Sequence, residues 1–380
     1  MQTVKNIYNK KTPLFFSEIE RFIQSLPPRL SLNQTQTNNR DLNSGINSFL
    51  NSYLNHYNID FVNTHIAKKY FLWASTFNVS PLHTDPHAKI TLPHYRIVQH
   101  YWKTENKYNE ASEEKSKGTV VIVHGYLDHT GLYGRAIQWA LTQGYDVLSF
   151  DLPGHGLSSG DPASIINFDT YSEILDDIIR QNQHTLTKPL IALGQSTGCA
   201  IICHSLLAKK NTVTSSLAEE NPPIKESAPD RPFTQAILLA PLVRSQHWRW
   251  LRYIYFLLRP TVYSIQRNFV RSSHHQAFNQ FIKNADPLQA SRIPLLWLGA
   301  MEQWYQTIQY SSQTCDLPLT IIQGTGDTTV DWRYNIPALS RIFTHSHSYF
   351  IQDAQHHLVN ESPEYWHKVE TFLTQQLKIP

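Results

Sequence analysis

The stretch LIALGQSTGCAIICHSLL, residues 190–207, has the pattern of a buried strand that runs into a helix. Leu190–Gly194 is apolar, and Cys199–Leu207 is a run of mainly small and apolar residues. Two glycines flank Ser196, each two positions away. A sharp strand-to-helix turn needs neighbours without side chains, and it lifts the central hydroxyl into a cleft at the helix N-terminus. The pattern predicts a nucleophile elbow at Ser196; a flexible loop is the plainer alternative.

Length and composition indicate one large globular domain with additions, or two modest domains. The chain has 380 residues, of which 41% are hydrophobic and 17% are charged. No apolar run approaches the ~18 residues that a bilayer-spanning helix needs. The first residues lack an apolar core and a small-residue cleavage site, so we expect no signal peptide.

Cysteine usage favours a reducing compartment. The three cysteines, 199, 203 and 315, are too few for a disulfide framework, so we expect reduced core thiols. We therefore expect a cytoplasmic protein, with a peripheral position on the inner membrane face as one option. No cysteine–histidine spacing has the form of a zinc site, and we expect no metal and no organic cofactor.

Strand-like and helix-like segments alternate along most of the chain, which predicts an α/β fold. We expect a mostly parallel central sheet with helices on both faces. The candidate strands are His94–Trp102, Thr119–His124, Asp146–Asp151, Leu190–Gly194, 236–241, Leu319–Gly324 and Ser346–Ile351. The candidate helices are Tyr133–Gln143, Tyr171–Asn182 and a closing helix from Pro363.

Four regions follow from this pattern. Residues 93–241 and 301–380 form the expected core, and residues 242–300 an inserted cap or lid. Residues 1–92 are expected to form an N-terminal extension, mostly helical or irregular.

Some segments of the chain stand apart from the core pattern. Within residues 1–92, helix-like patches cover Ser17–Gln24 and Ile46–Tyr57, and the aromatic segment at 65–77 must pack on something. Residues 209–232 are polar and contain prolines, which indicates a surface excursion.

A serine hydroxyl is a weak nucleophile, so it needs a histidine base that a carboxylate holds in one tautomer. Such partners are expected after late strands, because the carboxyl ends of parallel strands gather at one edge of the sheet. Asp327 follows one late strand in GTGDTTVD, and His356 follows the next in DAQHHLVNE. The chain order Ser196, Asp327, His356 is the order expected for this fold.

Each partner has a competitor in the sequence. Asp331 lies four residues after Asp327, and His357 directly follows His356. An ordinary turn aspartate and a surface histidine are the plainer interpretations. The segment after Pro241 holds no carboxylate, which favours Asp327 as the acid.

Two backbone N–H groups are needed to stabilise the oxyanion of a tetrahedral intermediate. Thr197 follows the nucleophile and is expected to supply one of them. Tyr126 is expected to supply the other, since it follows the tight His124–Gly125 turn after an early strand. The alternative is that His124–Gly125 is only a turn.

Five segments together resemble the monoacylglycerol lipase and lysophospholipase branch of the α/β-hydrolase family. They are VIVHGYLDHTGLY, DLPGHGLSSG, GQSTG, GTGDTTVD and DAQHHLVNE, in order over about residues 95–376. The resemblance implies the α/β-hydrolase fold, with Ser196 as nucleophile, Asp327 as acid and His356 as base. It also implies oxyanion donors at Tyr126 and Thr197.

The same resemblance leaves the substrate open, because the family also includes esterases, thioesterases and aminopeptidases. It implies that DLPGHGLSSG is a structural loop that shapes the site. The sequence departs from the family at 126–128, where Tyr-Leu-Asp stands in place of a small residue and a Gly-Glu pair. This departure bears on the width of the pocket beside the oxyanion hole. The first ~90 residues match no part of the family pattern.

The cap segment combines arginine with large aromatic residues. No Asp or Glu occurs from Pro241 to Ala285, yet six arginines do, at 244, 249, 252, 259, 267 and 271. This composition is typical of a segment that meets an anionic membrane, and its apolar side chains suit an acyl chain. We expect four cap residues to bind substrate: Trp248, Trp250, Tyr253 and Phe256. A cap helix packed on its own domain with solvated arginines is the alternative.

These patterns predict a serine hydrolase that cleaves the carboxylic ester of a monoacyl lipid through an acyl-enzyme. A short-chain carboxylesterase or thioesterase is the alternative enzyme. A catalytically silent α/β-hydrolase scaffold that binds lipid or protein is the alternative from another class. The expected partners are a small lipid or ester substrate and an anionic membrane surface. Nothing outside the cap indicates nucleic-acid binding, and the sequence does not fix the oligomeric state.

Overall fold

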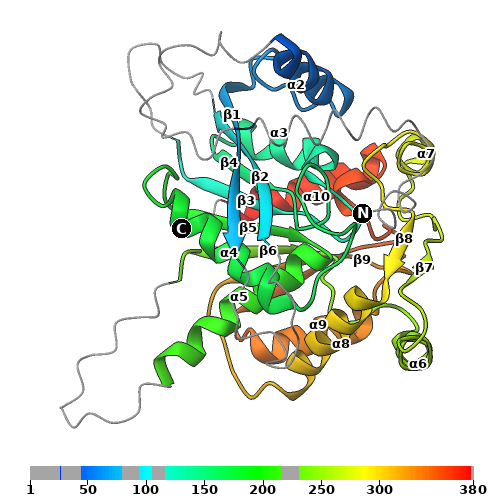
Figure 1. Cartoon of the computed structure of the whole chain (residues 1–380). Coiled ribbons are helices and arrows are strands. Elements are labelled where there is room, and N and C mark those ends of the chain that lie inside the picture. The colour runs from blue at the N-terminus through cyan, green and yellow to red at the C-terminus, as the bar shows by residue number, and fades with distance from the viewer. Residues whose placement is uncertain (1–25, 27–43, 79–93, 105–115, 215–230, 378–380) are drawn as a thin grey trace, which may run out of the picture.

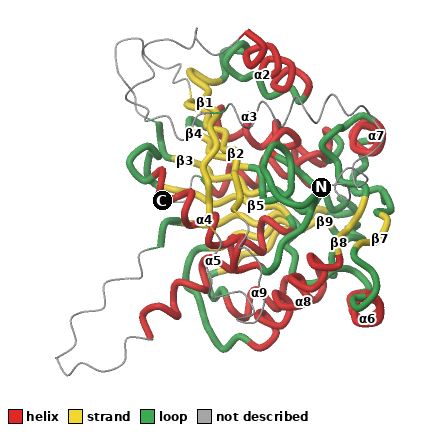
Figure 2. Tube along the Cα trace, viewed as in Figure 1, coloured by secondary structure: helices red, strands yellow, loops and turns green. Residues whose placement is uncertain are grey.

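The computed structural model describes residue 26 and residues 44–78, 94–104, 116–214 and 231–377. An eight-stranded sheet runs through the molecule in the order β1-β2-β4-β3-β5-β6-β9-β10 (Figures 1 and 2). Its strands are β1 (Ala67–Asn78), β2 (His94–Thr104), β3 (Thr119–Val123), β4 (Asp146–Phe150), β5 (Leu190–Gln195), β6 (Gln235–Leu239), β9 (Leu319–Gly324) and β10 (Ser346–Ile351). The pairs β1–β2 and β2–β4 are antiparallel, and the other pairs are parallel.

Helices cover both faces of the sheet (Figure 1). One face packs against α4 (Phe168–Asn182), α5 (Thr197–Thr214), α8 (Leu295–Tyr310) and α9 (Trp332–Ile342). The other packs against α2 (Ser44–His56), α3 (Gly134–Thr142), α7 (Gln276–Asn284) and α10 (Pro363–Gln376). Residues of β3 alternate between the two cores: Val121 and Val123 point to one, Val120 and Ile122 to the other. The predicted mostly parallel sheet with helices on both faces is confirmed.

Strand β1 is the main addition to what the sequence indicated. Residues 67–78 pair with β2 along their whole length, so this aromatic segment is a strand of the main sheet. Trp73 and Phe77 enter one core, and Leu72 and Ala74 the other, as the two-residue period of a strand requires. The helix expected at Ile46–Tyr57 is present as α2, and the patch at Ser17–Gln24 lies outside the described residues.

The first residues of the polar excursion expected at 209–232 belong to a helix instead. Helix α5 continues to Thr214, and the segment from 215 to 230 lies outside the described residues. All three cysteines are buried and free, as expected. No helix within the described ranges has both the length and the apolar character needed to cross a bilayer.

The segment expected to form the cap, residues 242–300, contains α6 (Trp248–Leu258), a short antiparallel pair of β7 (Ser264–Gln266) and β8 (Arg292–Pro294), α7 and the start of α8. Trp304 of α8 anchors this region to the core by packing and by a hydrogen bond. Its ring stacks on Phe168 of α4 at 5.7 Å between centroids, and its indole N–H donates to the Leu242 carbonyl at 2.9 Å. The Leu242 N–H in turn donates to the carbonyl of Ser196, so this contact supports the elbow.

The Trp304→Phe variant tests this anchor. It leaves the buried Leu242 carbonyl without its donor, so we expect the free energy of unfolding to fall by about 1–3 kcal/mol, plus a loss of packing. Trp73→Phe is the matched control: Trp73 is also buried, and its indole N–H makes no hydrogen bond with the described residues. Urea unfolding of both variants measures the difference. Equal losses would contradict a role for the hydrogen bond.

Candidate active site

Ser196 stands between β5 and α5 in a left-handed backbone conformation, with φ of +52°. The chain segments around it are in close contact: a Cβ at position 198 would lie 2.0 Å from the Val123 carbonyl oxygen. A Cβ at position 194 would lie 2.7 Å from the Cys199 nitrogen. Only glycine fits at these two places, and this explains their spacing around the serine.

His356 and Asp327 form a buried pair at the same edge of the sheet. His356 Nδ1 lies 2.8 Å from Asp327 Oδ2, and these residues follow β10 and β9 respectively. The other carboxylate oxygen of Asp327 accepts from the N–H groups of Thr329 (2.7 Å) and Val330 (3.2 Å). A histidine that donates from Nδ1 presents Nε2 as the acceptor, which is the tautomer a general base requires.

The electrostatics of this pair oppose the effect of burial. Burial by itself would raise the pKa of Asp327, but the charge and hydrogen bond of His356 hold that pKa below its usual value. Burial would likewise lower the pKa of His356, and the Asp327 carboxylate raises it above its usual value. The pair therefore keeps a carboxylate ionised where an isolated one would be costly.

The two competitors have other partners. Asp331 accepts from the guanidinium of Arg244 at 2.7 and 2.9 Å. His357 Nε2 lies 3.2 Å from Asp128 Oδ2. The geometry favours Asp327 and His356 over these neighbours.

Gln195 links the end of β5 to the His356 loop. Its side-chain amide donates to the His356 carbonyl at 3.4 Å, and its amide oxygen accepts from the Val359 N–H at 3.3 Å. Ser196 follows directly, so the serine and the histidine lie at one edge of the sheet. The described residues include no hydrogen bond between the Ser196 hydroxyl and His356.

The turn after β3 packs against the elbow. A Cβ at Gly125 would lie 3.5 Å from the Ser196 Cβ. The Gly125 N–H donates to the Tyr133 hydroxyl at 2.8 Å, and that hydroxyl donates to Asp128 at 2.9 Å, which holds the turn. Tyr126 is next in the chain, and Thr197 is the first residue of α5, where a helix has unused N–H groups.

The Tyr126 side chain joins this turn to the cap. Its ring stacks on Trp297 of α8 with centroids 3.6 Å apart and planes 11° apart. Its hydroxyl donates to the Ala163 carbonyl at 2.8 Å. The large residue at this position therefore forms a stacked wall between the turn and the cap.

The loop containing DLPGHGLSSG is held by a buried aspartate. Asp151 accepts from the N–H groups of Thr130 (2.8 Å) and Leu157 (2.7 Å), one on each carboxylate oxygen. The N–H of Leu152 donates to His124 Nε2 at 2.9 Å. The loop is thus joined to the turn after β3, in agreement with a structural role.

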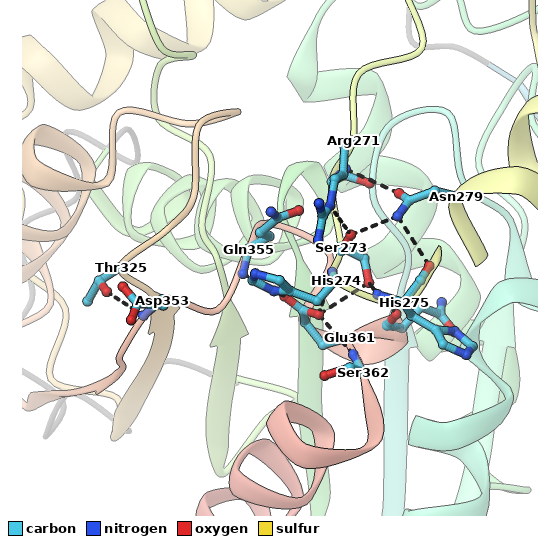
Figure 3. A network of polar contacts seen from close by, with 12 residues as sticks. Arg271, Ser273, His274, His275, Asn279, Thr325, Asp353, Gln355, Glu361 and Ser362 are labelled. Atoms are coloured by element: carbon cyan, nitrogen blue, oxygen red, sulfur yellow. Dashed lines mark hydrogen bonds and ion pairs between the residues drawn. The ribbon is translucent and has the colours of Figure 1, made fainter. Parts of the chain in front are cut away.

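Glu361 is a further carboxylate of the site that sequence reasoning missed (Figure 3). It is fully buried, and it accepts from the N–H of Gln355, the residue before His356, at 2.7 Å. From the cap it accepts from His274 Nδ1 (2.9 Å), the His274 N–H (2.8 Å) and the Ser273 hydroxyl (3.2 Å). It therefore joins the His356 loop to the cap. An acidic residue a few positions after the histidine, in the segment HHLVNESP, is the signal that could have found it.

The four residues expected to bind substrate all lie on α6, in different surroundings. Trp248 is buried and packs on Tyr305, with ring centroids 5.9 Å apart. Trp250 and Tyr253 are 71% and 65% exposed and line a surface hollow with Arg244 and Asp331. Phe256 is also exposed. Their role in binding an acyl chain stays a prediction.

Comparison with known proteins identifies the family. Residues 114–363 match the hydrolase family described as serine aminopeptidase, S33. The chain is also 35% identical over 112 residues to a monoacylglycerol lipase of Mycolicibacterium smegmatis. That match covers 28% of this chain and 36% of the relative, so it spans about a third of the relative's length.

Solved structures show the same fold. A soluble variant of monoglyceride lipase from Saccharomyces cerevisiae is 16% identical, with a TM-score of 0.60 over 80% of this chain and 94% of that one. A monoacylglycerol lipase of Paleococcus ferrophilus is 18% identical, with a TM-score of 0.56 over 74% and 98%. The chain therefore belongs to the serine aminopeptidase S33 family and has the α/β-hydrolase fold that its sequence predicts.

Proposed function

We propose that this chain is a serine hydrolase that cleaves the carboxylic ester of a monoacyl lipid, either a monoacylglycerol or a lysophospholipid. One observation carries the proposal: a serine in a left-handed strand-to-helix turn lies at the same sheet edge as a buried His356–Asp327 pair. Membership of a hydrolase family supports the reaction class.

The proposed reaction has two stages. Ser196 Oγ attacks the ester carbonyl while His356 Nε2 takes its proton, and Asp327 holds the imidazolium that forms. The N–H groups of Tyr126 and Thr197 stabilise the oxyanion. His356 then protonates the leaving alcohol, and a water activated by the same histidine releases the fatty acid from Ser196.

Two observations favour a lipid over other esters. The relative from M. smegmatis is named a monoacylglycerol lipase, and the cap presents an apolar surface. A short-chain carboxylesterase or thioesterase is the alternative within the same chemistry. A silent scaffold would have no use for the paired and buried Asp327 and His356.

We further propose that α6 contacts an anionic membrane. Trp250, Tyr253 and Leu257 are spaced along one face of the helix and are 65–71% exposed. Arg252 forms an ion pair with Glu302 at 2.8 Å, whereas Arg249 and Arg259 form no ion pair with the described residues. Exposed apolar groups beside uncompensated arginines suit a surface of acyl chains and phosphates.

Substitutions in the triad test the reaction assignment. Ser196→Ala and His356→Gln should abolish hydrolysis of 4-nitrophenyl butyrate. Asp327→Asn should lower kcat by roughly three to four orders of magnitude, because the wrong histidine tautomer is favoured. His357→Gln and Asp331→Asn, the matched controls, should have mild effects. A larger loss in either control than in its neighbour would show that the wrong acid or base has been assigned.

The pH profile tests the His356–Asp327 coupling. His356 must be neutral to act as base, and Asp327 raises its pKa, so kcat/KM should fall as the pH drops through that raised value. Asp327→Asn removes the carboxylate that raises the pKa of His356. The fall in residual activity that accompanies protonation of His356 should therefore occur at a lower pH than in wild type. The measurement is kcat/KM for 4-nitrophenyl butyrate across the pH range. An unmoved or upward-shifted acid limb in Asp327→Asn would count against the coupling.

Vesicle binding tests the membrane proposal. We expect stronger binding to phosphatidylglycerol vesicles than to phosphatidylcholine vesicles, weakened by salt, with about 1 kcal/mol from each arginine. The Arg249→Gln/Arg259→Gln variant should bind anionic vesicles less while hydrolysing 4-nitrophenyl butyrate normally. Lys68→Gln/Lys69→Gln removes the same charge from exposed positions of β1 and should bind like wild type. Wild-type protein that ignores anionic vesicles at low salt would exclude this role for α6.

A further inference from the structure

Tyr57, at the end of the segment that contains α2, is buried against two distant parts of the chain. Its hydroxyl donates to Asp286 Oδ1 of the cap at 2.7 Å. Its ring stands edge-on to His129, with centroids 4.8 Å apart. A Cβ at Gly131 would lie 2.7 Å from the Tyr57 ring, so this glycine leaves the space that the tyrosine fills.

Asp286 is the carboxylate at which these segments meet. Its second oxygen lies 3.0 Å from His129 Nε2 and accepts from Gln289 at 2.8 Å. The side chains of His129 and Asp286 are both inaccessible to solvent. A buried carboxylate depends on its donors, so removal of one donor changes how the others hold it.

His129 belongs to the segment that carries the proposed oxyanion donor. The preceding residue, Asp128, is bound by the Tyr133 hydroxyl, which also accepts from the Gly125 N–H. Tyr126 lies between these two fixed points. Tyr126 and His129 belong to the same short segment, 125–129, so a shift of the Asp286–His129 pair has only a short stretch of chain to cross before it reaches the Tyr126 N–H.

We propose that Tyr57 is a positioning residue for the hydrolase reaction. By fixing the Asp286 carboxylate, its hydroxyl holds His129, and with it the turn at 125–128, in one arrangement relative to the cap. The segment before β1 thereby helps to position the turn beside the active-site serine. This inference rests on the proposed function, because it acts through the Tyr126 N–H as an oxyanion donor, where small displacements cost turnover.

The Tyr57→Phe variant of the full chain tests the proposal against a matched control. Tyr53 lies on α2, with its ring 5.0 Å from that of Tyr57, and its buried hydroxyl donates no hydrogen bond to the described residues. Well below the unfolding midpoint, Tyr57→Phe should lower kcat for 4-nitrophenyl butyrate by roughly three- to tenfold with KM little changed. Tyr53→Phe should stay within about twofold of wild type.

A double-mutant cycle with Asp286→Asn separates positioning from general destabilisation. Asp286→Asn should also lower kcat, and Tyr57→Phe should cost little more in that background, since both changes break one link. A Tyr57→Phe variant that melts earlier but keeps wild-type kcat, equal losses in Tyr53→Phe, or additive losses in the cycle would each overturn the inference alone. Wild-type protein without ester turnover would overturn the proposed function, and this inference with it.

Discussion

The carbonyl oxygen of Val123 occupies the place where any side chain at position 198 would stand. This contact lets α5 begin directly against β3, and it holds the chain at Ser196 in a left-handed turn. Such a conformation is costly for a residue with a Cβ, so it persists because the packing on both sides enforces it. The sheet order also brings these segments together. Strands β3, β5 and β6 are neighbours, so the turn at Gly125 lies beside the serine.

Carboxylates that are buried or partly buried join the loops around this turn. Each pairs with a histidine from a different loop: Asp327 with His356, Asp128 with His357, Asp286 with His129 and Glu361 with His274. Loops at the end of a sheet have few regular backbone hydrogen bonds, so side-chain pairs of this kind give them a fixed position. Only the first pair is proposed to take part in the reaction; the other three connect the cap, the turn after β3 and the His356 loop.

Much of the core could be predicted from the sequence because its signals are local. Most of the parallel strands are short, mainly apolar runs that end in a turn motif, and Ser196 and Asp327 each follow such a run, whereas His356 follows the more polar strand SHSYFI. Strand β1 was missed because its 12 residues carry no clear alternation, and its assignment depends on pairing with β2. The contacts of Glu361 and Tyr57 join residues 87 and 229 positions apart, and no local pattern reports them. The environment of α6 was equally inaccessible, since burial of Trp248 and exposure of Trp250 depend on how the cap docks.

The central claim is that Ser196 is an activated nucleophile. A fluorophosphonate probe forms a covalent bond only with a serine whose hydroxyl is deprotonated by a neighbouring base and whose oxyanion is stabilised. Labelling of the full chain, followed by mass-spectrometric mapping of the modified peptide, tests this directly. The account predicts one modified residue, Ser196, and loss of labelling in His356→Gln. Absence of labelling, or labelling at another serine, would contradict it.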